Sequence, residues 1–249
     1  MSKQVLILNY HELISEEDRV QKEFDPVYAV TKENFIQQMK LIKERNIPVC
    51  SLSEVIAGTN QDVFSIAITF DDGYLSDLEV ADAILQENGY SAAFFPIISF
   101  VGMQGRLNWN QLKILAGRGY NIGSHGLNHI NLTGIHEEEL LNELEGSKRE
   151  LERQLKKEIS IIAFPYGKYT KSVMNSAKNA GYRTGLSTHT KINNSESSLV
   201  LHRWNIKMST SLEEFEMLIS GNRSIRAKNA ILSKVKSLVY NVSSKLKKS

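Results

Sequence analysis

Two adjacent carboxylates, Asp71 and Asp72, directly follow an apolar run at residues 64–70. The run is typical of a buried strand, and parallel α/β folds place catalytic groups at the carboxyl ends of their strands. Neighbouring carboxylates repel each other unless a cation separates them or one holds a proton. A metal ion on one carboxylate would resolve this conflict and leave the other free as a base. Alone, the pair would also fit a simple Asp-Gly turn at a strand end.

Two histidines four residues apart, His125 and His129, follow a second predicted strand at residues 120–123. Because this spacing is one helical turn, both imidazoles can face one metal ion. The chain has six histidines, and a pair at ligand spacing just past a strand end strengthens the interpretation of the two carboxylates. One Asp and two His leave coordination positions open, which is typical of a catalytic site and not of a closed structural one.

A third polar turn, Pro165-Tyr166-Gly167, follows the apolar run at residues 159–162. A backbone N–H in such a turn can face a developing oxyanion. Taken by itself, the sequence fits an ordinary turn better.

The elements that must position these residues alternate along the chain. Apolar residues at helical spacing predict helices at residues 33–45, 75–88 and 136–157. Strands separated by helices of this length indicate βαβ units, and about seven such units favour a (β/α) barrel over an open sheet. We therefore expect one barrel domain at residues 1–221 and a tail at residues 222–249. The predicted strands are residues 5–10, 48–52, 64–70, 92–97, 120–123, 159–164, 183–186 and 199–206.

Composition excludes several other classes of protein. The 249 residues are 41% apolar and contain one cysteine, Cys50, which therefore has no intramolecular disulfide partner and suits a reducing compartment. No apolar run approaches the roughly 20 residues of a membrane-spanning helix. Residues 5–8 are too short for the core of a signal peptide, so we expect a cytoplasmic protein.

The net charge of +2 combines two unlike parts. Residues 222–249 hold eight basic residues and no acidic one, whereas the preceding residues hold 22 basic and 28 acidic residues, a net charge of −6. Apolar residues of the tail fall on one helical stripe. The tail either packs on the barrel or lies on an anionic membrane surface. Nucleic-acid binding is disfavoured, because the acidic part would repel a phosphate backbone.

These motifs together resemble the polysaccharide deacetylases of carbohydrate esterase family 4, the NodB-homology domain. Residues 69–74 (TFDDGY), 125–129 (HGLNH) and 164–167 (FPYG) resemble the three motifs of that family. The opening Leu8-Asn9-Tyr10-His11 resembles a circularly permuted subgroup with a Tyr-His strand at the front.

The resemblance implies a distorted (β/α) barrel of about seven units and a metal-dependent N-deacetylase of acetylated amino sugars. It implies that Asp72, His125 and His129 bind the metal ion and that Asp71 is the general base. Zinc suits this mixed ligand set, and cobalt or nickel would also fit. Tyr166 would supply an oxyanion-hole N–H. The metal would polarise the acetyl carbonyl and lower the pKa of bound water.

The sequence departs from the family pattern at two places. Ala163 stands where the third motif carries an arginine, and Arg203 is the candidate that replaces it in orienting the base. The general acid of the family is a histidine at the end of a Leu-rich strand, which both His11 and His202 match. The permuted order favours His11.

The expected substrate is an N-acetylated saccharide in glycan assembly. The basic tail favours a lipid-linked saccharide at the inner face of the cell membrane. The protein would then contact this membrane peripherally through residues 222–249. Two alternatives remain open at this point: another amide hydrolase on the same scaffold that opens a small cyclic ureide or imide, and a glycan-binding relic without catalysis.

Overall fold

The computed structural model describes residues 4–17, 19, 24–59, 64–194 and 199–220. The chain divides into two compact units, Met1–Ser209 and Thr210–Ser249. In the second unit the described residues form helix α8 (Leu212–Ile219), whose first turn is capped by the Ser211 side chain. The basic tail at residues 222–249 lies outside the described residues, and the domain boundary at residue 221 stays a prediction.

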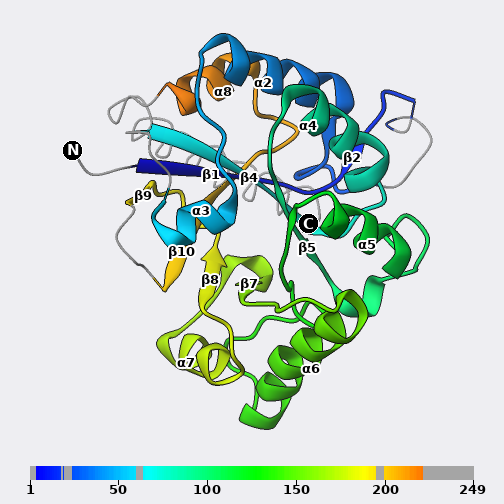
Figure 1. Ribbon diagram of the computed structural model, residues 1–249, viewed down its shortest axis with the longest axis vertical. Helices are drawn as coiled ribbons and strands as arrows, with labels where there is room; N and C mark the ends of the chain where they lie inside the picture. Colours follow the sequence, from blue (N-terminus) through cyan, green and yellow to red (C-terminus); the bar gives the residue numbers. More distant parts are fainter. Residues whose placement is uncertain (1–3, 18, 20–23, 60–63, 195–198, 221–249) are drawn as a thin grey trace, which may run out of the picture. The chain divides into compact units, whose positions relative to one another are not determined.

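The first unit is built on seven parallel strands that follow one another around a barrel (Figure 1). Their order is β6-β5-β4-β1-β10-β8-β7. An isolated parallel bridge between Ser124 and Ile162 joins the two ends of this order, so the sheet nearly closes. The predicted (β/α) barrel is thereby confirmed. The strands are β1 (Gln4–Tyr10), β4 (Phe64–Asp72), β5 (Ala93–Pro96), β6 (Asn121–Ile122), β7 (Ile161–Ala163), β8 (Thr184–Ser187) and β10 (Val200–Asn205).

Most helices of this unit lie around the outside of the barrel, whereas α3 lies in front of the strands in this view and its Leu52 and Val55 pack into the apolar cluster inside (Figure 1). Helix α2 contacts α4, α5 contacts α6, and α6 contacts α7. They are α2 (Lys32–Glu44), α3 (Leu52–Ala57), α4 (Asp82–Asn88), α5 (Trp109–Gly117), α6 (Glu137–Leu155) and α7 (Lys171–Asn179). The short elements are β2 (Leu13–Ile14), β3 (Val30–Thr31), β9 (Asn193–Asn194), the π-helical turn η1 (Asp77–Ala81) and the 3-10 turns η2 (Ile98–Phe100) and η3 (Pro165–Gly167).

Alternate strand residues face the barrel interior and the helices, as the period of a strand requires. Inside, Ile7, Ala67 and Phe95 belong to one buried apolar cluster. Outside, the rings of Tyr10 and Phe70 stack across neighbouring strands with centroids 5.4 Å apart. The ring of Phe35 on α2 packs edge-on against both, at 5.1 Å from Tyr10 and 5.8 Å from Phe70. The strands are thus buried on both faces, and the polar residues at their carboxyl ends rest on a packed frame.

Two predicted elements differ from the structure. Residues 48–52 form no strand: Val49 makes an isolated bridge to Ile66, and α3 begins at Leu52. The cause is a capping box in which Ser51 and Glu54 satisfy each other's backbone N–H groups, which starts a helix where the apolar run suggested a strand. The predicted helix at 75–88 begins with the wider turn η1 before it becomes α4.

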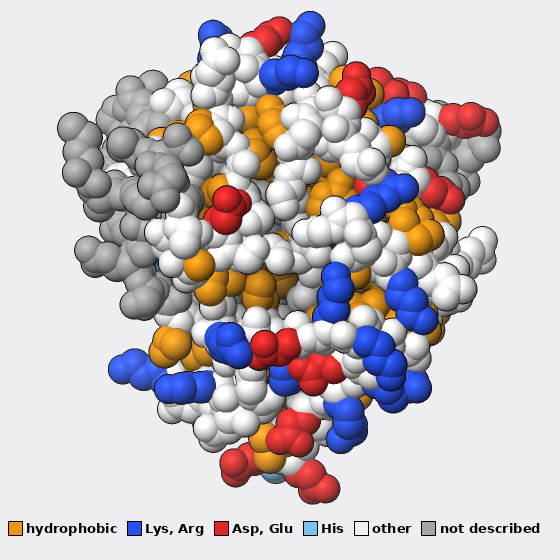
Figure 2. Space-filling model, in the orientation of Figure 1, with side chains coloured by type: hydrophobic (Ala, Val, Ile, Leu, Met, Phe, Trp, Pro, Cys, Tyr) orange, Lys and Arg blue, Asp and Glu red, His pale blue; other side chains and the backbone are white. Residues whose placement is uncertain are grey.

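On the face shown in Figure 2, basic and acidic side chains are interspersed with small apolar areas. Among the described residues, no helix combines the length and apolar character that crossing a membrane requires.

Candidate metal and catalytic site

The predicted site residues come from five strands, β1, β4, β6, β7 and β10, whose carboxyl ends meet at one edge of the barrel. Asp71 and Asp72 end β4, and His125 follows β6. Arg203 lies in β10, and His11 follows β1. Because these strands are parallel, this edge is where a (β/α) barrel collects its functional groups.

The backbone of Asp72 is held in a conformation that non-glycine residues rarely adopt, with φ at 74°. Gly73 follows with φ at 67°, and a Cβ there would lie 2.9 Å from the Cβ of Pro96. Arg106 Nη1 donates a hydrogen bond of 3.0 Å to the carbonyl oxygen of Asp72. Such strain persists only where the surroundings enforce it, and the Asp72 carboxylate held in this way faces both histidines.

Asp72, His125 and His129 form a candidate metal site. Their ligand atoms all lie within 4.8 Å of one another. Asp72 Oδ1 is 3.4 Å from Nε2 of His125 and 3.7 Å from Nε2 of His129. This oxygen is buried and has no hydrogen-bond partner. An orphaned carboxylate oxygen facing two imidazole nitrogens fits a divalent cation between the three groups.

The two imidazoles are brought together by an irregular loop and not by the helical turn that the sequence predicted. Residues 125–129 are irregular, with φ at 84° for Gly126 and at 56° for His129. His125 Nδ1 lies 2.8 Å from the carbonyl oxygen of Ala163 and can donate to it, which leaves Nε2 as the ligand atom. Burial, and then the neighbouring His125, lower the pKa of His129. Both effects favour the neutral imidazole, which is the form that binds metals.

Asp71 is an ionised carboxylate held by Arg203. The side chains are 2% and 0% exposed, and two nitrogens of the guanidinium each lie 2.7 Å from one oxygen of Asp71. Burial raises the pKa of Asp71, but the Arg203 charge, followed by His125, holds that pKa well below its usual range. Arg203 therefore fixes both carboxylate oxygens of Asp71, whereas position 163 holds an alanine that cannot make such a contact.

Asn9 completes the support of Asp71, a function that was not predicted from the sequence. Its Nδ2 donates to Asp71 Oδ2 at 3.0 Å, and its Oδ1 accepts from Arg203 Nη1 at 2.7 Å and from Thr69 Oγ1 at 2.8 Å. The signal that could have found it is strand alternation, because Asn9 lies two residues after the inward-facing Ile7.

The two candidate general acids lie in different environments. His11 is half-buried next to the site: desolvation lowers its pKa, while the charges of Asp71 and Asp72 act in the opposite direction. Its ring stacks on Tyr28 at 4.8 Å between centroids. His202 instead hydrogen-bonds Ser187 Oγ through Nδ1 at 2.8 Å. Because its neighbour Arg203 faces the interior, His202 points to the outside of the barrel.

Tyr166 lies in the turn η3 after β7, with φ at 59°. Its side chain is 58% exposed, and its ring centroid lies 4.7 Å from that of His129. The turn predicted to carry an oxyanion-hole N–H therefore borders the candidate metal site.

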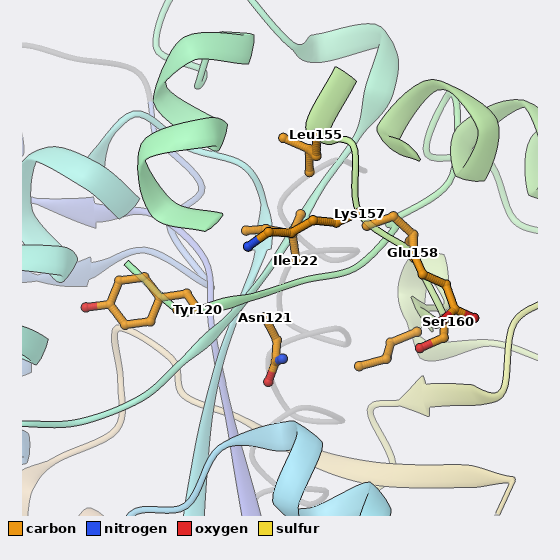
Figure 3. Close-up of a pocket in the computed structure, with 10 residues that line it drawn as sticks. Tyr120, Asn121, Ile122, Leu155, Lys157, Glu158 and Ser160 are labelled. Atoms are coloured by element: carbon orange, nitrogen blue, oxygen red, sulfur yellow. The ribbon is translucent and has the colours of Figure 1, made fainter. Parts of the chain in front are cut away.

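A separate pocket of about 210 Å³ lies elsewhere in the barrel unit (Figure 3). Its walls include Tyr120 and Asn121 at the start of β6, and Lys157 and Ser160 before β7. These are the amino ends of the strands, opposite to the edge that carries Asp71, so the pocket is not part of the candidate site.

The fold and the ligand cluster together define a parallel (β/α) barrel with a candidate metal centre at the carboxyl ends of its strands. Residues 58–185, about half of the chain, match the family model for polysaccharide deacetylase. The chain belongs to the polysaccharide deacetylase family.

Individual relatives agree with this assignment. A protein of Bacillus subtilis (strain 168) named "Putative polysaccharide deacetylase YxkH" is 28% identical over 64% of this chain and 58% of its own length. A peptidoglycan-N-acetylglucosamine deacetylase of Bacillus cereus is 32% identical over 49% of this chain and 55% of its own. The chain thus spans little more than half the length of these curated relatives. Among solved structures, the Streptococcus pyogenes deacetylase PplD in complex with acetate has the same fold, with a TM-score of 0.77 at 24% identity over 88% of this chain and 100% of that one.

Proposed function

We propose that the protein is a metal-dependent hydrolase that removes the N-acetyl group of an amino sugar within a saccharide. The observation that carries the proposal is the pairing of an ionised, doubly hydrogen-bonded Asp71 with the ligand cluster of Asp72, His125 and His129. Membership of the deacetylase family supports this activity over the hydrolysis of cyclic amides. The named substrates of the relatives support an N-acetylated glycan as the substrate class.

Zinc is the proposed metal, with cobalt and nickel as chemically acceptable substitutes. Asp72, His125 and His129 would hold it and would leave further coordination positions open. When bound, a divalent cation supplies a Lewis acid that polarises the acetyl carbonyl.

Asp71 is proposed as the general base that takes a proton from the attacking water. Arg203 and Asn9 fix the two carboxylate oxygens, so that the base is ionised and oriented before substrate arrives. His11 is proposed as the general acid that protonates the leaving amine, because it is half-buried and lies within the electrostatic field of Asp71 and Asp72. The N–H of Tyr166 is proposed to stabilise the developing oxyanion.

The test is acetate release from a panel of N-acetylated saccharides, with and without a chelator. We expect release by the untreated protein, loss of release with the chelator and recovery after Zn²⁺ is added back. Asp71→Asn should lose activity, whereas Glu87→Gln, an exposed position on α4, should retain it. An absence of release from every saccharide by the metal-loaded protein would contradict the proposed function.

We further propose that the substrate is lipid-linked and that residues 222–249 bring the chain to an anionic membrane surface, on the cytoplasmic side. Eight cations without an acidic residue support this proposal, since each contributes about 1 kcal/mol close to such a surface. The full chain should bind anionic vesicles in a salt-dependent way, and a chain ending at residue 221 should not. Equal binding by both chains would refute the membrane proposal, and it would leave the deacetylase proposal intact.

A further inference from the structure

Helix α6 supports the loop that carries the two metal-binding histidines. Its residues Glu143 and Ser147 lie one helical turn apart and both contact this loop. Ser147 Oγ lies 2.9 Å from Ser124 Oγ, and Ser124 directly precedes His125. The Ser124 hydroxyl in turn accepts a 3.0 Å hydrogen bond from the N–H of Gly126. The first half of the loop is therefore fixed to α6 through two serines.

Glu143 holds the second half of the loop. Its Oε2 accepts the backbone N–H groups of Leu127 at 2.9 Å and Asn128 at 3.0 Å, and its Oε1 accepts Nδ2 of Asn128 at 2.7 Å. Glu143 is 1% exposed. Within the described ranges, Glu143 forms no ion pair with Lys or Arg. The three hydrogen bonds from the loop therefore compensate the burial of the Glu143 carboxylate. Because the acceptor is a carboxylate, these hydrogen bonds are charge-assisted and strong.

The loop also fits closely around this carboxylate. A Cβ on Gly126 would lie 3.2 Å from Glu143 Oε2 and 3.5 Å from Pro165 Cγ, and Gly126 has φ at 84°. Glycine at this position is therefore what lets the backbone reach Glu143.

The two histidines depend on α6 to different degrees. His125 has further supports, because its backbone N–H donates to Pro96 and its Nδ1 bonds to Ala163. His129 has a left-handed backbone, a side chain that is 22% exposed, and the doubly bonded Asn128 as its direct neighbour. We infer that Glu143 is a positioning residue that sets His129 as the third ligand of the metal site. This inference rests on the metal site of the proposed function.

Cobalt binding by the full chain tests the inference without any substrate. Co²⁺ is titrated into metal-free protein, and its visible absorption reports affinity and the ligand set. Glu143→Leu should weaken Co²⁺ binding by about 10–100-fold, the usual effect of removing a residue that orients a ligand, and should change the spectrum as His129 leaves. Glu145→Leu is the matched control, since Glu145 is exposed on the same helix. It should bind Co²⁺ like the wild type.

A second variant keeps the test informative if Glu143→Leu does not fold. Glu143→Gln retains one oxygen for the two backbone N–H groups, and its new amide can donate to Asn128 after the Asn128 side chain flips. It should therefore bind Co²⁺ within a few-fold of the wild type and restore its spectrum. Combining Glu143→Gln with Asn128→Leu removes the side-chain amide that would accept from Gln at position 143. This double variant should bind Co²⁺ more weakly than Glu143→Gln alone.

Wild-type affinity and spectrum in a folded Glu143→Leu variant, or in the Glu143→Gln, Asn128→Leu double variant, would overturn the inference. Failure of the proposed function has a different signature. Wild-type protein that binds Co²⁺ but releases no acetate refutes deacetylation and leaves the positioning result standing, whereas wild-type protein that binds no Co²⁺ refutes both.

Discussion

Replacing Arg203 by methionine should destabilise the protein strongly. The guanidinium is 0% exposed and makes two 2.7 Å hydrogen bonds to Asp71, so Arg203→Met leaves a buried carboxylate without its cation. Breaking a buried pair from one side costs about 3–5 kcal/mol. For a domain of this size that loss lowers Tm by roughly 6–20 °C. Urea unfolding followed by circular dichroism measures the free energy directly.

The chain offers a matched control for this change. Arg153 makes the same two-point contact with Glu150, at 2.7 and 2.8 Å, but its side chain is 61% exposed. Arg153→Met should cost far less stability than Arg203→Met, because exposed ion pairs are screened by solvent and contribute little. Adding Asp71→Asn to Arg203→Met removes the uncompensated charge and should recover part of the stability. An Arg203→Met variant within 1 kcal/mol of the wild type would refute the assignment of Arg203 as the cation that compensates Asp71.

The same substitution should change the pH dependence. In the folded protein the pKa of Asp71 is held well below its value in the unfolded chain. Ionised Asp71 therefore stabilises the folded wild type at pH values above the unfolded-state pKa, and this stabilisation is lost as the pH falls toward the folded-state pKa. Without Arg203, burial dominates and the pKa of Asp71 rises. Because a general base works only when ionised, the acid limb of the kcat profile should move to higher pH.

Four substitutions address individual functional groups. His125→Ala should lower the bound metal measured by elemental analysis, and equal metal content in the variant and the wild type would exclude His125 as a ligand. Asp71→Asn should keep the metal and lose roughly 10²–10⁴-fold in kcat, the range for a general base, and near-wild-type turnover would limit Asp71 to a packing function. His11→Ala should lose kcat on a similar scale, while His202→Ala should stay within a few-fold of the wild type; the reverse order would make His202 the general acid.

The sequence predicts the barrel and the positions of the acids and histidines because both depend on local patterns. Apolar runs mark the strands, and polar groups directly after them must gather at one edge. The mode of convergence was not predictable in the same way. The spacing of His125 and His129 suggested a helical turn, whereas the structure uses two left-handed residues whose conformation depends on contacts with another part of the chain.

The supporting residues are harder to find for a related reason. Asn9 and Glu143 act through partners that are distant in sequence, such as Asn9 with Asp71 across 62 positions. Neither belongs to a recognisable pattern, because Asn9 lies inside an apolar strand and Glu143 among many glutamates of α6. Arg203 is predictable from the sequence only because Ala163 stands where the third motif carries an arginine, which leaves Asp71 in need of another cation.

The seam of the barrel has a consequence for local opening. Strands β6 and β7 are joined at the bridge of Ser124 with Ile162, where Ser124 N–H donates to Ile161 and Ala163 N–H donates to Ser124. These two amides should exchange with solvent deuterium faster than those of the long β1–β4 ladder, since fewer hydrogen bonds must break to expose them. His125 is adjacent to the seam, and its candidate metal partner Asp72 ends β4 on the other side of β5. A bound cation would therefore join the ends of β4 and β6 across β5, on one side of the seam, and should slow exchange at the carboxyl ends of these strands while the seam itself stays free to open.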